Sequence, residues 1–156
     1  MRVEIRAVGR LRKGPEHSLC ADYLDRFART GRGLGLGAPQ LREVEDRKAG
    51  GAEGEGALLL RGLPQEAKLC VLDERGATMT SPDFAATLAA WRDEGVGVAV
   101  FMIGGADGVS EAVTRRADLC LSFGPMVWPH MLARVMLSEQ LYRASAILAG
   151  TPYHRV

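Results

Sequence analysis

The sequence predicts one α/β domain over residues 1–156, with a mostly parallel sheet flanked by helices. Three observations support this fold class. Strand-like and helix-like segments alternate along the chain, as they do in proteins with parallel sheets. The runs 69–72 and 98–103 are apolar throughout, which is typical of strands buried on both faces. The second of these runs is followed by a glycine-rich loop and by a helix that Ser110 would cap.

Residue patterns place the individual elements. Val3, Ile5 and Ala7 alternate with charged residues, which indicates a half-buried first strand. Ser81 and Pro82 indicate the N-cap and the first position of a helix that runs to about residue 94. The other expected elements are a helix at 15–29, a glycine-rich break at 31–37, a short strand at 41–45, a mobile loop at 49–56, a weak helix at 57–62, strands at 69–72, 98–103 and 119–122, and a helix at 131–148.

Composition excludes several classes of protein. Hydrophobic residues make up 47% of the chain and charged residues 25%, as in ordinary globular proteins. No apolar run approaches the roughly 20 residues of a membrane helix, and the N-terminus lacks a signal-peptide pattern. We therefore expect a cytoplasmic protein without a membrane partner. Cys20, Cys70 and Cys120 are too widely spaced to indicate a disulfide framework or a metal site, and we expect the last two to pack in the core.

Charge gives a local signal only. The net charge of +1 does not by itself indicate nucleic acid as a partner. Residues 1–13, however, carry five basic side chains against Glu4 alone. Two interpretations stay open: contact with phosphate groups, or a solvated edge strand with its charges on the open face.

The glycine-rich segment 104–108 has the context of a ligand-binding loop. It follows a buried strand and precedes a capped helix, where glycines let a ligand approach the backbone closely. A plain tight turn is the alternative. In open α/β sheets ligands bind at the carboxyl ends of the strands, so the strand ends at Leu72, Gly104 and Phe123 would lie at one ligand-binding edge.

The C-terminal 36 residues combine a rigid loop, a long helix and a polar tail. Proline, glycine and tryptophan crowd the loop 123–130, which favours a pocket wall over a plain connector. The helix that follows is apolar on two faces, so we expect the sheet to cover one face and a second subunit the other. Glu139 and Arg143 are spaced as a helical ion pair. The tail Tyr153–Arg155 offers groups for stacking, proton transfer and anion binding, with a frayed terminus as the alternative.

Four motifs resemble one enzyme family. They are Phe101-x-Ile-Gly-Gly-Ala-x-Gly108, Leu121-Ser-Phe-x-x-Met-x-x-Pro-His130, Arg134-Val-x-Leu-x-Glu-Gln-x-Tyr-Arg-Ala144 and Tyr153-His-Arg155. With the chain length, they resemble the ribosomal large-subunit methyltransferases that modify N3 of a pseudouridine in 23S rRNA, within the SPOUT class. The resemblance covers the whole chain and is most specific in residues 98–155. The segments 31–37 and 47–56 depart from the family pattern, so their role and the N-terminal RNA contacts stay open.

The resemblance implies a deep trefoil knot at the C-terminus, a homodimer, and S-adenosyl-L-methionine bound by the knot loops without a metal. The partner would be 23S rRNA in the large subunit or the assembled ribosome. Matched by position, the implied cofactor contacts are Leu72, Gly104, Phe123, Gly124, Pro125, Met126, Val127 and Trp128. The implied substrate-end residues are His130, Arg134, Glu139, Arg143, Tyr153, His154 and Arg155. The tail would complete the partner subunit's site.

Methyl transfer to N3 needs in-line positioning and a deprotonated nitrogen. We expect His154 first and His130 second to handle the proton. An arginine, either Arg155, Arg134 or Arg143, would stabilise the resulting anion. Two other functions stay open: a SPOUT methyltransferase with another RNA target, and a non-catalytic ribosome-binding factor.

Overall fold

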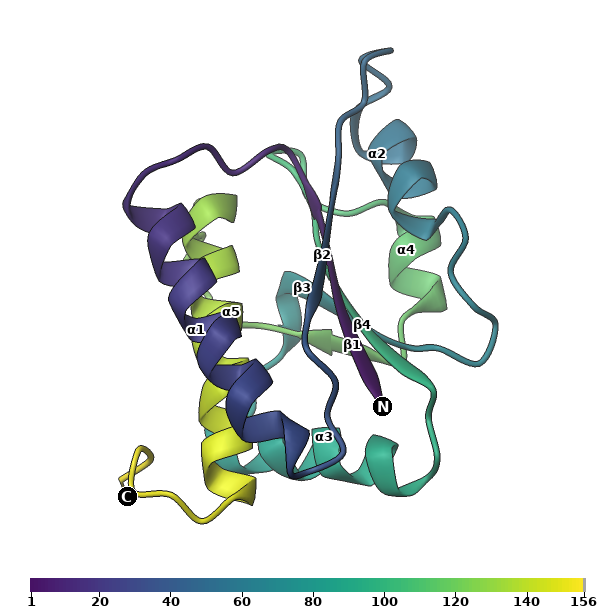
Figure 1. Ribbon diagram of the computed structural model, residues 1–156. Helices are drawn as coiled ribbons and strands as arrows, with labels where there is room; N and C mark the ends of the chain where they lie inside the picture. Colours follow the sequence, from purple (N-terminus) through teal and green to yellow (C-terminus); the bar gives the residue numbers. More distant parts are fainter. Residues whose placement is uncertain (156) are drawn as a thin grey trace.

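The computed structural model describes residues 1–155. Its strands are β1 (Arg2–Val8), β2 (Gln40–Val44), β3 (Lys68–Ala77), β4 (Val98–Ile103) and β5 (Leu119–Leu121). Its helices are α1 (Pro15–Arg32), α2 (Gly51–Leu60), α3 (Ser81–Asp93), α4 (Glu111–Arg116) and α5 (His130–Leu148). All strand pairs are parallel, in the order β2-β1-β4-β3-β5, and helices lie on both faces of the sheet (Figure 1). The expected α/β class with a parallel sheet is confirmed.

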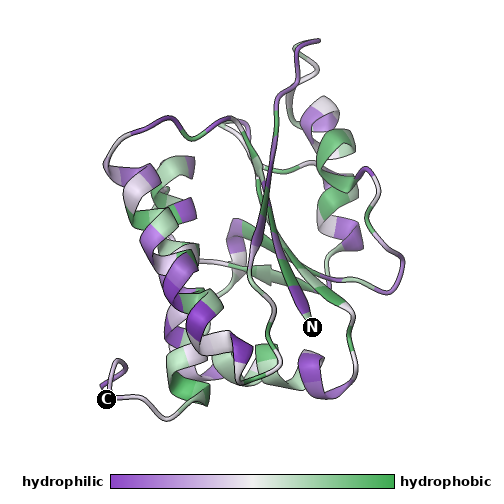
Figure 2. Cartoon of the chain, in the orientation of Figure 1, coloured by the Kyte–Doolittle hydropathy of each residue, from purple (hydrophilic) through white to green (hydrophobic). Residues whose placement is uncertain are grey.

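β4 occupies the middle of the sheet and is buried on both faces. Phe101 and Ile103 pack in the core that α1, α3 and α5 share with the sheet. Val100 and Met102 face the other way, into the core under α2 and α4. Figure 2 shows this central strand as mostly hydrophobic. Because full burial of each such side chain stabilises the fold by about 1.5–3 kcal/mol, the end of β4 is a firmly held platform for the loop that follows.

β1 is an interior strand between β2 and β4, so the interpretation of residues 1–13 as a solvated edge strand is wrong. Arg6 on this strand is only 2% exposed. Its guanidinium donates to the carbonyl oxygens of Leu59 (2.7 Å) and Arg61 (2.9 Å) and to Glu4 (2.6 Å). These partners satisfy a charge whose burial would otherwise be costly. Arg6 therefore joins β1 to the end of α2 and is withdrawn from any phosphate-binding surface.

In the segment 49–56, expected to be a mobile loop, residues 51–56 form more than half of α2, so that prediction is wrong. Its glycines serve close packing instead of flexibility. A Cβ on Gly54 would collide with the Asp46 carboxylate, and a Cβ on Gly56 would lie 2.9 Å from the Ser110 Cβ. The helix forms because its second half buries leucines against the sheet, and tertiary packing outweighs the low helix propensity of glycine.

One of the two helix caps expected from the sequence is confirmed, and the other lies one residue earlier. Ser110 caps α4 as expected and accepts the Val113 N–H at 3.4 Å. The N-cap of α3 is Thr80 rather than Ser81. The Thr80 hydroxyl accepts the Asp83 N–H at 3.2 Å, which satisfies a donor that the first helical turn leaves free.

The glycine-rich break after α1 closes the amino end of the sheet. Leu36 is 1% exposed in the core, and a Cβ on Gly31 would lie 3.1 Å from the Leu36 backbone oxygen. The Gly37 N–H donates to the Met1 carbonyl, and the Met1 amine donates to the Gly35 carbonyl, both at 2.8 Å. The break therefore has a structural role at the edge opposite the carboxyl ends of the strands.

The end of β3 crosses β5 in backbone contact. A Cβ on Gly76 would lie 2.5 Å from the carbonyl oxygen of Cys120, so the crossing requires glycine. The Ser122 N–H donates to the Ala77 carbonyl (2.9 Å), and the Ser122 hydroxyl donates to the Glu74 carbonyl (3.0 Å). These contacts tie the ends of the two strands together. The C-terminal trefoil knot implied by the resemblance stays a prediction.

α5 packs against α1 and α3 of its own chain, so part of the face expected to need a second subunit is covered internally. Met131 and Leu132 near its start remain 40% exposed. Cys70 is buried, as expected, whereas Cys120 is only partly buried. No helix in the described part of the chain is long and apolar enough to cross a membrane.

Candidate active site

A cavity of about 490 Å³ opens at the carboxyl edge of the sheet. Its walls come from the ends of β3, β4 and β5 and from the first turn of α5. Leu72, Gly104 and Phe123, the strand ends expected to share one edge, all line it. Small-molecule sites typically enclose about 300–1,000 Å³, so the cavity has the size of a ligand site.

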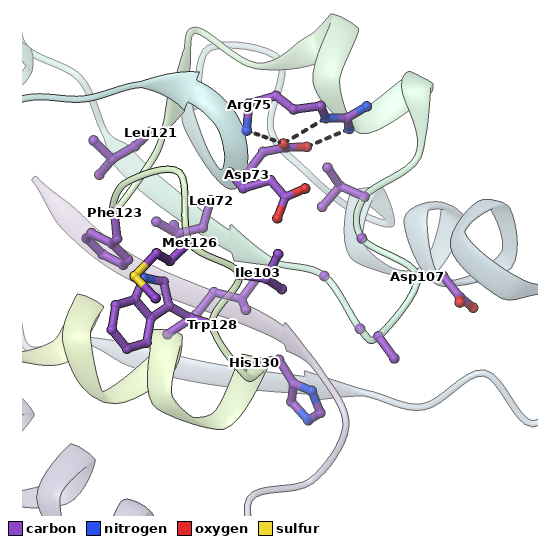
Figure 3. A pocket seen from close by; sticks show the side chains of 18 of the residues that line it. Leu72, Asp73, Arg75, Ile103, Asp107, Leu121, Phe123, Met126, Trp128 and His130 are labelled. Carbon is purple, nitrogen blue, oxygen red and sulfur yellow. Dashed lines mark hydrogen bonds and ion pairs between the residues drawn. The ribbon is translucent and has the colours of Figure 1, made fainter.

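Apolar side chains form one wall of the cavity. Figure 3 shows Phe123, Met126 and Trp128 gathered on one side of it. All of the implied cofactor contacts except Pro125 line the cavity, and Pro125 belongs to the same loop. Met126 and Val127 are 71% and 78% exposed. The outer part of this wall is therefore open to solvent.

Asp73 supplies a negative charge to the cavity lining. Its carboxylate accepts the Arg75 backbone N–H (2.8 Å) and two guanidinium N–H groups (3.0 and 2.8 Å). The hydrogen bonds from Arg75 lower the pKa of Asp73, so the carboxylate is ionised at neutral pH. Asp73 was not among the residues expected at the site. It directly follows the apolar run 69–72, and the end of that run is the feature that indicated Leu72.

Gly104 allows the loop after β4 to turn tightly at the cavity. A Cβ there would lie 2.7 Å from the carbonyl carbon of Gly108 and 2.9 Å from the Val109 side chain. Gly105 and Gly108 form an isolated bridge, and Gly108 has a φ of 78°. The segment 104–108 is therefore a tight turn that also lines the cavity.

His130 and Arg134 lie one turn apart at the start of α5 and differ in exposure. His130 begins α5 and lines the cavity. Arg134, one turn later, is 2% exposed and donates to Glu43 (2.6 Å) and to the carbonyl oxygens of Gly9 (3.0 Å) and Val8 (3.4 Å). These bonds hold the start of α5 on the ends of β1 and β2. Arg134 thus positions His130.

The tail folds back onto α5. Glu139 accepts hydrogen bonds from Arg143 (2.6 and 3.0 Å) and from the Tyr153 hydroxyl (2.9 Å). Arg143 also lies 3.2 Å from His154 Nδ1. We call Glu139, Arg143, Tyr153 and His154 the tail cluster. Burial and the Glu139 carboxylate raise the pKa of Tyr153, so its hydroxyl stays protonated and donating. Arg155 is exposed beyond the cluster.

Similarity to known proteins connects this geometry to an enzyme family. A family model described as "Predicted SPOUT methyltransferase" matches residues 1–154. The chain belongs to the SPOUT methyltransferase family. Two curated proteins named "Ribosomal RNA large subunit methyltransferase H" align over 100% of both chains: that of Dinoroseobacter shibae is 63% identical, and that of Cereibacter sphaeroides strain ATCC 17025 is 64% identical. The solved structure of a probable methylase family protein from Haemophilus influenzae Rd KW20 matches 99% of this chain and 70% of its own, with a TM-score of 0.52 and 12% identity. That last likeness is one of fold.

In this SPOUT family member the tail cluster and the cavity are separated within one chain. His130 lies at the cavity and Arg143 in the tail cluster, and the rise along α5 between them is about 20 Å. Figure 1 shows that the tail leaves α5 at the end opposite its start. The tail cluster and the cavity therefore lie near opposite ends of α5. Within residues 1–155, no group of three or more His, Cys, Asp or Glu side chains is placed to hold a metal ion.

Glu55 of α2 is an acidic neighbour of the glycine loop. A Cβ on Gly105 would lie 2.8 Å from Glu55 Oε2, and this buried oxygen has no hydrogen-bond partner among the described residues. Burial raises the pKa of Glu55; Asp107 and Asp46 raise it further, while His130 lowers it. Sequence analysis missed Glu55 in this SPOUT protein because its segment was expected to be a mobile loop.

Glu55→Gln should stabilise the SPOUT fold at neutral pH. A carboxyl whose pKa is raised in the folded state favours folding while it is protonated, and that contribution is lost as the pH rises through the folded-state pKa. The variant removes the charge, so its free energy of unfolding should exceed that of the wild type at neutral pH and converge with it in acid. Urea unfolding across this range measures the difference. Glu53→Gln, on the exposed side of the same helix, is the control that should change nothing.

Proposed function

We propose that this chain uses S-adenosyl-L-methionine to methylate N3 of a pseudouridine in 23S rRNA, on the assembled ribosome and as a homodimer. The observation that carries the proposal is the cavity at the sheet edge, which is lined by seven of the eight residues matched to cofactor contacts. Relatives that align over their whole length and carry the name ribosomal RNA large subunit methyltransferase support the RNA substrate.

The residues around the cavity fit this cofactor. Phe123, Met126 and Trp128 offer the flat and adaptable apolar surface that an adenine ring favours. Gly104 and Gly124 have no side chain between their backbone groups and a ligand, and Gly124 adopts a φ of 112° that other residues rarely take. When bound, the cofactor supplies an electrophilic methyl group. The protein then has to position the nucleotide in line with that group and prepare its nitrogen.

A second copy of the chain would bring a tail cluster to the cavity. Apolar side chains around the cavity rim are 40–78% exposed: Met126, Val127, Trp128, Met131 and Leu132. Contiguous apolar surface of this kind marks a protein interface. A twofold interface here would build two identical sites, each with the cavity of one chain and the tail of the other. This arrangement also overcomes the separation along α5.

The tail cluster suits a substrate that becomes an anion. Arginine can only donate, so Arg143 donates to His154 Nδ1, which leaves Nε2 as the ring nitrogen that can donate. We therefore assign His154 to donate from Nε2 to a carbonyl oxygen beside N3, together with the Arg155 guanidinium. His130, at the rim of the partner's cavity, becomes the candidate that receives the N3 proton.

Incubation of the purified protein with labelled S-adenosylmethionine and three substrates tests the proposed function. The substrates are free 23S rRNA, the large subunit and the assembled ribosome, all from cells that lack this protein. Nucleoside mass spectrometry should find one methyl group on a pseudouridine, and the assembled ribosome should react fastest. A methyl group on another nucleoside would mean another RNA target. Calorimetry that shows no cofactor binding would mean a non-catalytic ribosome-binding factor.

A further inference from the structure

The three tyrosines of the chain lie together, although the sequence separates them widely. The ring centroids of Tyr23 and Tyr142 are 6.3 Å apart, and those of Tyr142 and Tyr153 are 4.5 Å apart. The first ring belongs to α1, the second to α5 and the third to the tail. All three are partly buried, and Tyr142 also packs against the core that α1, α3 and α5 share, so they meet where this core reaches the surface. Their contacts fix three separate segments relative to one another.

Two arginines extend the contacts between the tyrosines. The Arg26 Cζ lies 5.8 Å from the centre of the Tyr142 ring, and the Arg143 Cζ lies 4.8 Å from the centre of the Tyr153 ring. Both distances fall in the range of cation–π attraction. We call Arg26, Tyr142, Tyr153 and Arg143, in this order, the arginine–tyrosine stack. It runs without a break from α1 to the tail cluster.

The tail depends on side chains because its backbone is bonded only at its start. The Thr151 N–H donates to the Ala146 carbonyl at 3.0 Å, and no later backbone hydrogen bond occurs within residues 1–155. Beyond that point Tyr153 is held by the tail cluster and by the face of Tyr142. The position of Tyr142 therefore decides where the tail lies.

We propose that Tyr23 and Arg26 are positioning residues for methyl transfer: through Tyr142 they hold Tyr153, and with it the tail cluster, where the substrate nucleotide is met. The inference rests on the proposed function, and it means that α1 helps to position the residues that meet the substrate nucleotide. Packing of α1 against the core does not require a phenol or a guanidinium, because Phe27 of the same helix is fully buried and serves that purpose. Tyr23 and Arg26 instead contact the partly buried ring of Tyr142.

The chain offers a matched control for Arg26. Arg26 pairs with Asp22 at 3.0 Å, and Arg29 pairs in the same way with Asp25 at 2.6 Å, each four residues apart on α1. Among the described residues, only Arg26 of these two lies over an aromatic ring. Arg26→Ala and Arg29→Ala therefore remove the same charge and the same kind of ion pair, and differ in the contact with the stack. Tyr23→Phe keeps the ring of Tyr23, whereas Tyr23→Ala removes it.

Steady-state methylation of ribosomes should separate these variants. Tyr23→Ala and Arg26→Ala should lower kcat about tenfold with little change in KM, because misplaced groups fail in the transition state and not in binding. Tyr23→Phe, which keeps the ring beside Tyr142, should retain more of the wild-type kcat than Tyr23→Ala. Arg29→Ala should behave as the wild type. Calorimetry should find the same affinity for S-adenosylmethionine in all four.

NMR relaxation of the backbone amides of residues 153–155 gives a second measurement that does not need activity. Tyr23→Ala and Arg26→Ala should lower the order parameters of these amides relative to Arg29→Ala and leave those of α5 unchanged. Equal order parameters and equal kcat in Arg26→Ala and Arg29→Ala would overturn the inference and leave the proposed function standing. A wild-type protein that transfers no methyl group would overturn the proposed function, and the order parameters would still decide whether α1 holds the tail.

Discussion

Gly104→Ala should abolish most of the binding of S-adenosylmethionine while the domain stays folded. A Cβ at this position would lie 2.7 Å from the carbonyl carbon of Gly108, and a backbone atom cannot rotate away as the end of a side chain can. Ala106, Asp107 and Gly108 are exposed, so the collision displaces the loop and not the core. The loop lines the cavity, and we expect affinity to fall about a hundredfold, roughly 2.7 kcal/mol.

Calorimetry with the cofactor and thermal unfolding measure the two parts of this prediction separately. Gly97→Ala is the matched control, because Gly97 precedes β4 as Gly104 follows it, and a Cβ there meets nothing within 4 Å. The control should bind the cofactor as the wild type does. If Gly104→Ala also bound it normally, the cavity would not be the cofactor site.

Glu139→Ala should lower methyl transfer about a hundredfold with cofactor affinity unchanged, because it removes the acceptor that Arg143 and Tyr153 share. The carboxylate accepts two hydrogen bonds from Arg143 and one from Tyr153. Without this carboxylate the Arg143 guanidinium loses its ion pair. Tyr153 and His154, which both contact Arg143, then lose their fixed positions. Glu139→Gln keeps the size but not the charge, so we expect an intermediate loss.

Single-turnover methylation of ribosomes measures the effect on chemistry directly. Glu111→Ala provides the control, because Glu111 forms an ion pair of the same spacing with Arg115 on α4, far more exposed and outside the tail cluster. The control should turn over at the wild-type rate. Equal rates for Glu139→Ala and Glu111→Ala would remove the tail cluster from the mechanism.

The cavity edge was predictable from sequence because it depends on a general property of parallel sheets. The carboxyl ends of parallel strands lie at one edge, so an apolar run followed by a glycine or a polar residue marks the site. Leu72, Gly104 and Phe123 were found this way, and the structure places all three around one cavity. The same reasoning could have included Asp73, which follows the run directly.

Other features depend on contacts between distant segments, which local patterns do not carry. The glycine content of residues 49–56 suggested a mobile loop, but α2 forms there. Gly54 and Gly56 allow the helix to lie close to Asp46 and Ser110, a contact that the local sequence does not reveal. In the same way, nothing in the sequence around Tyr23 indicates that it meets the tail. Such pairings become visible only in the folded chain.

We propose that each active site combines the cavity of one chain with the tail cluster of another. Mixed dimers of two variants distinguish this arrangement from a site within one chain. Gly104→Ala damages only the cavity and Glu139→Ala only the tail, and the two proteins are unfolded, mixed in equal amounts and refolded together. If sites are shared between chains, half of the dimers are mixed and each holds one intact site, so activity should recover to about a quarter of the wild type. Activity no higher than that of the separate variants would contradict the claim and place each active site within a single chain.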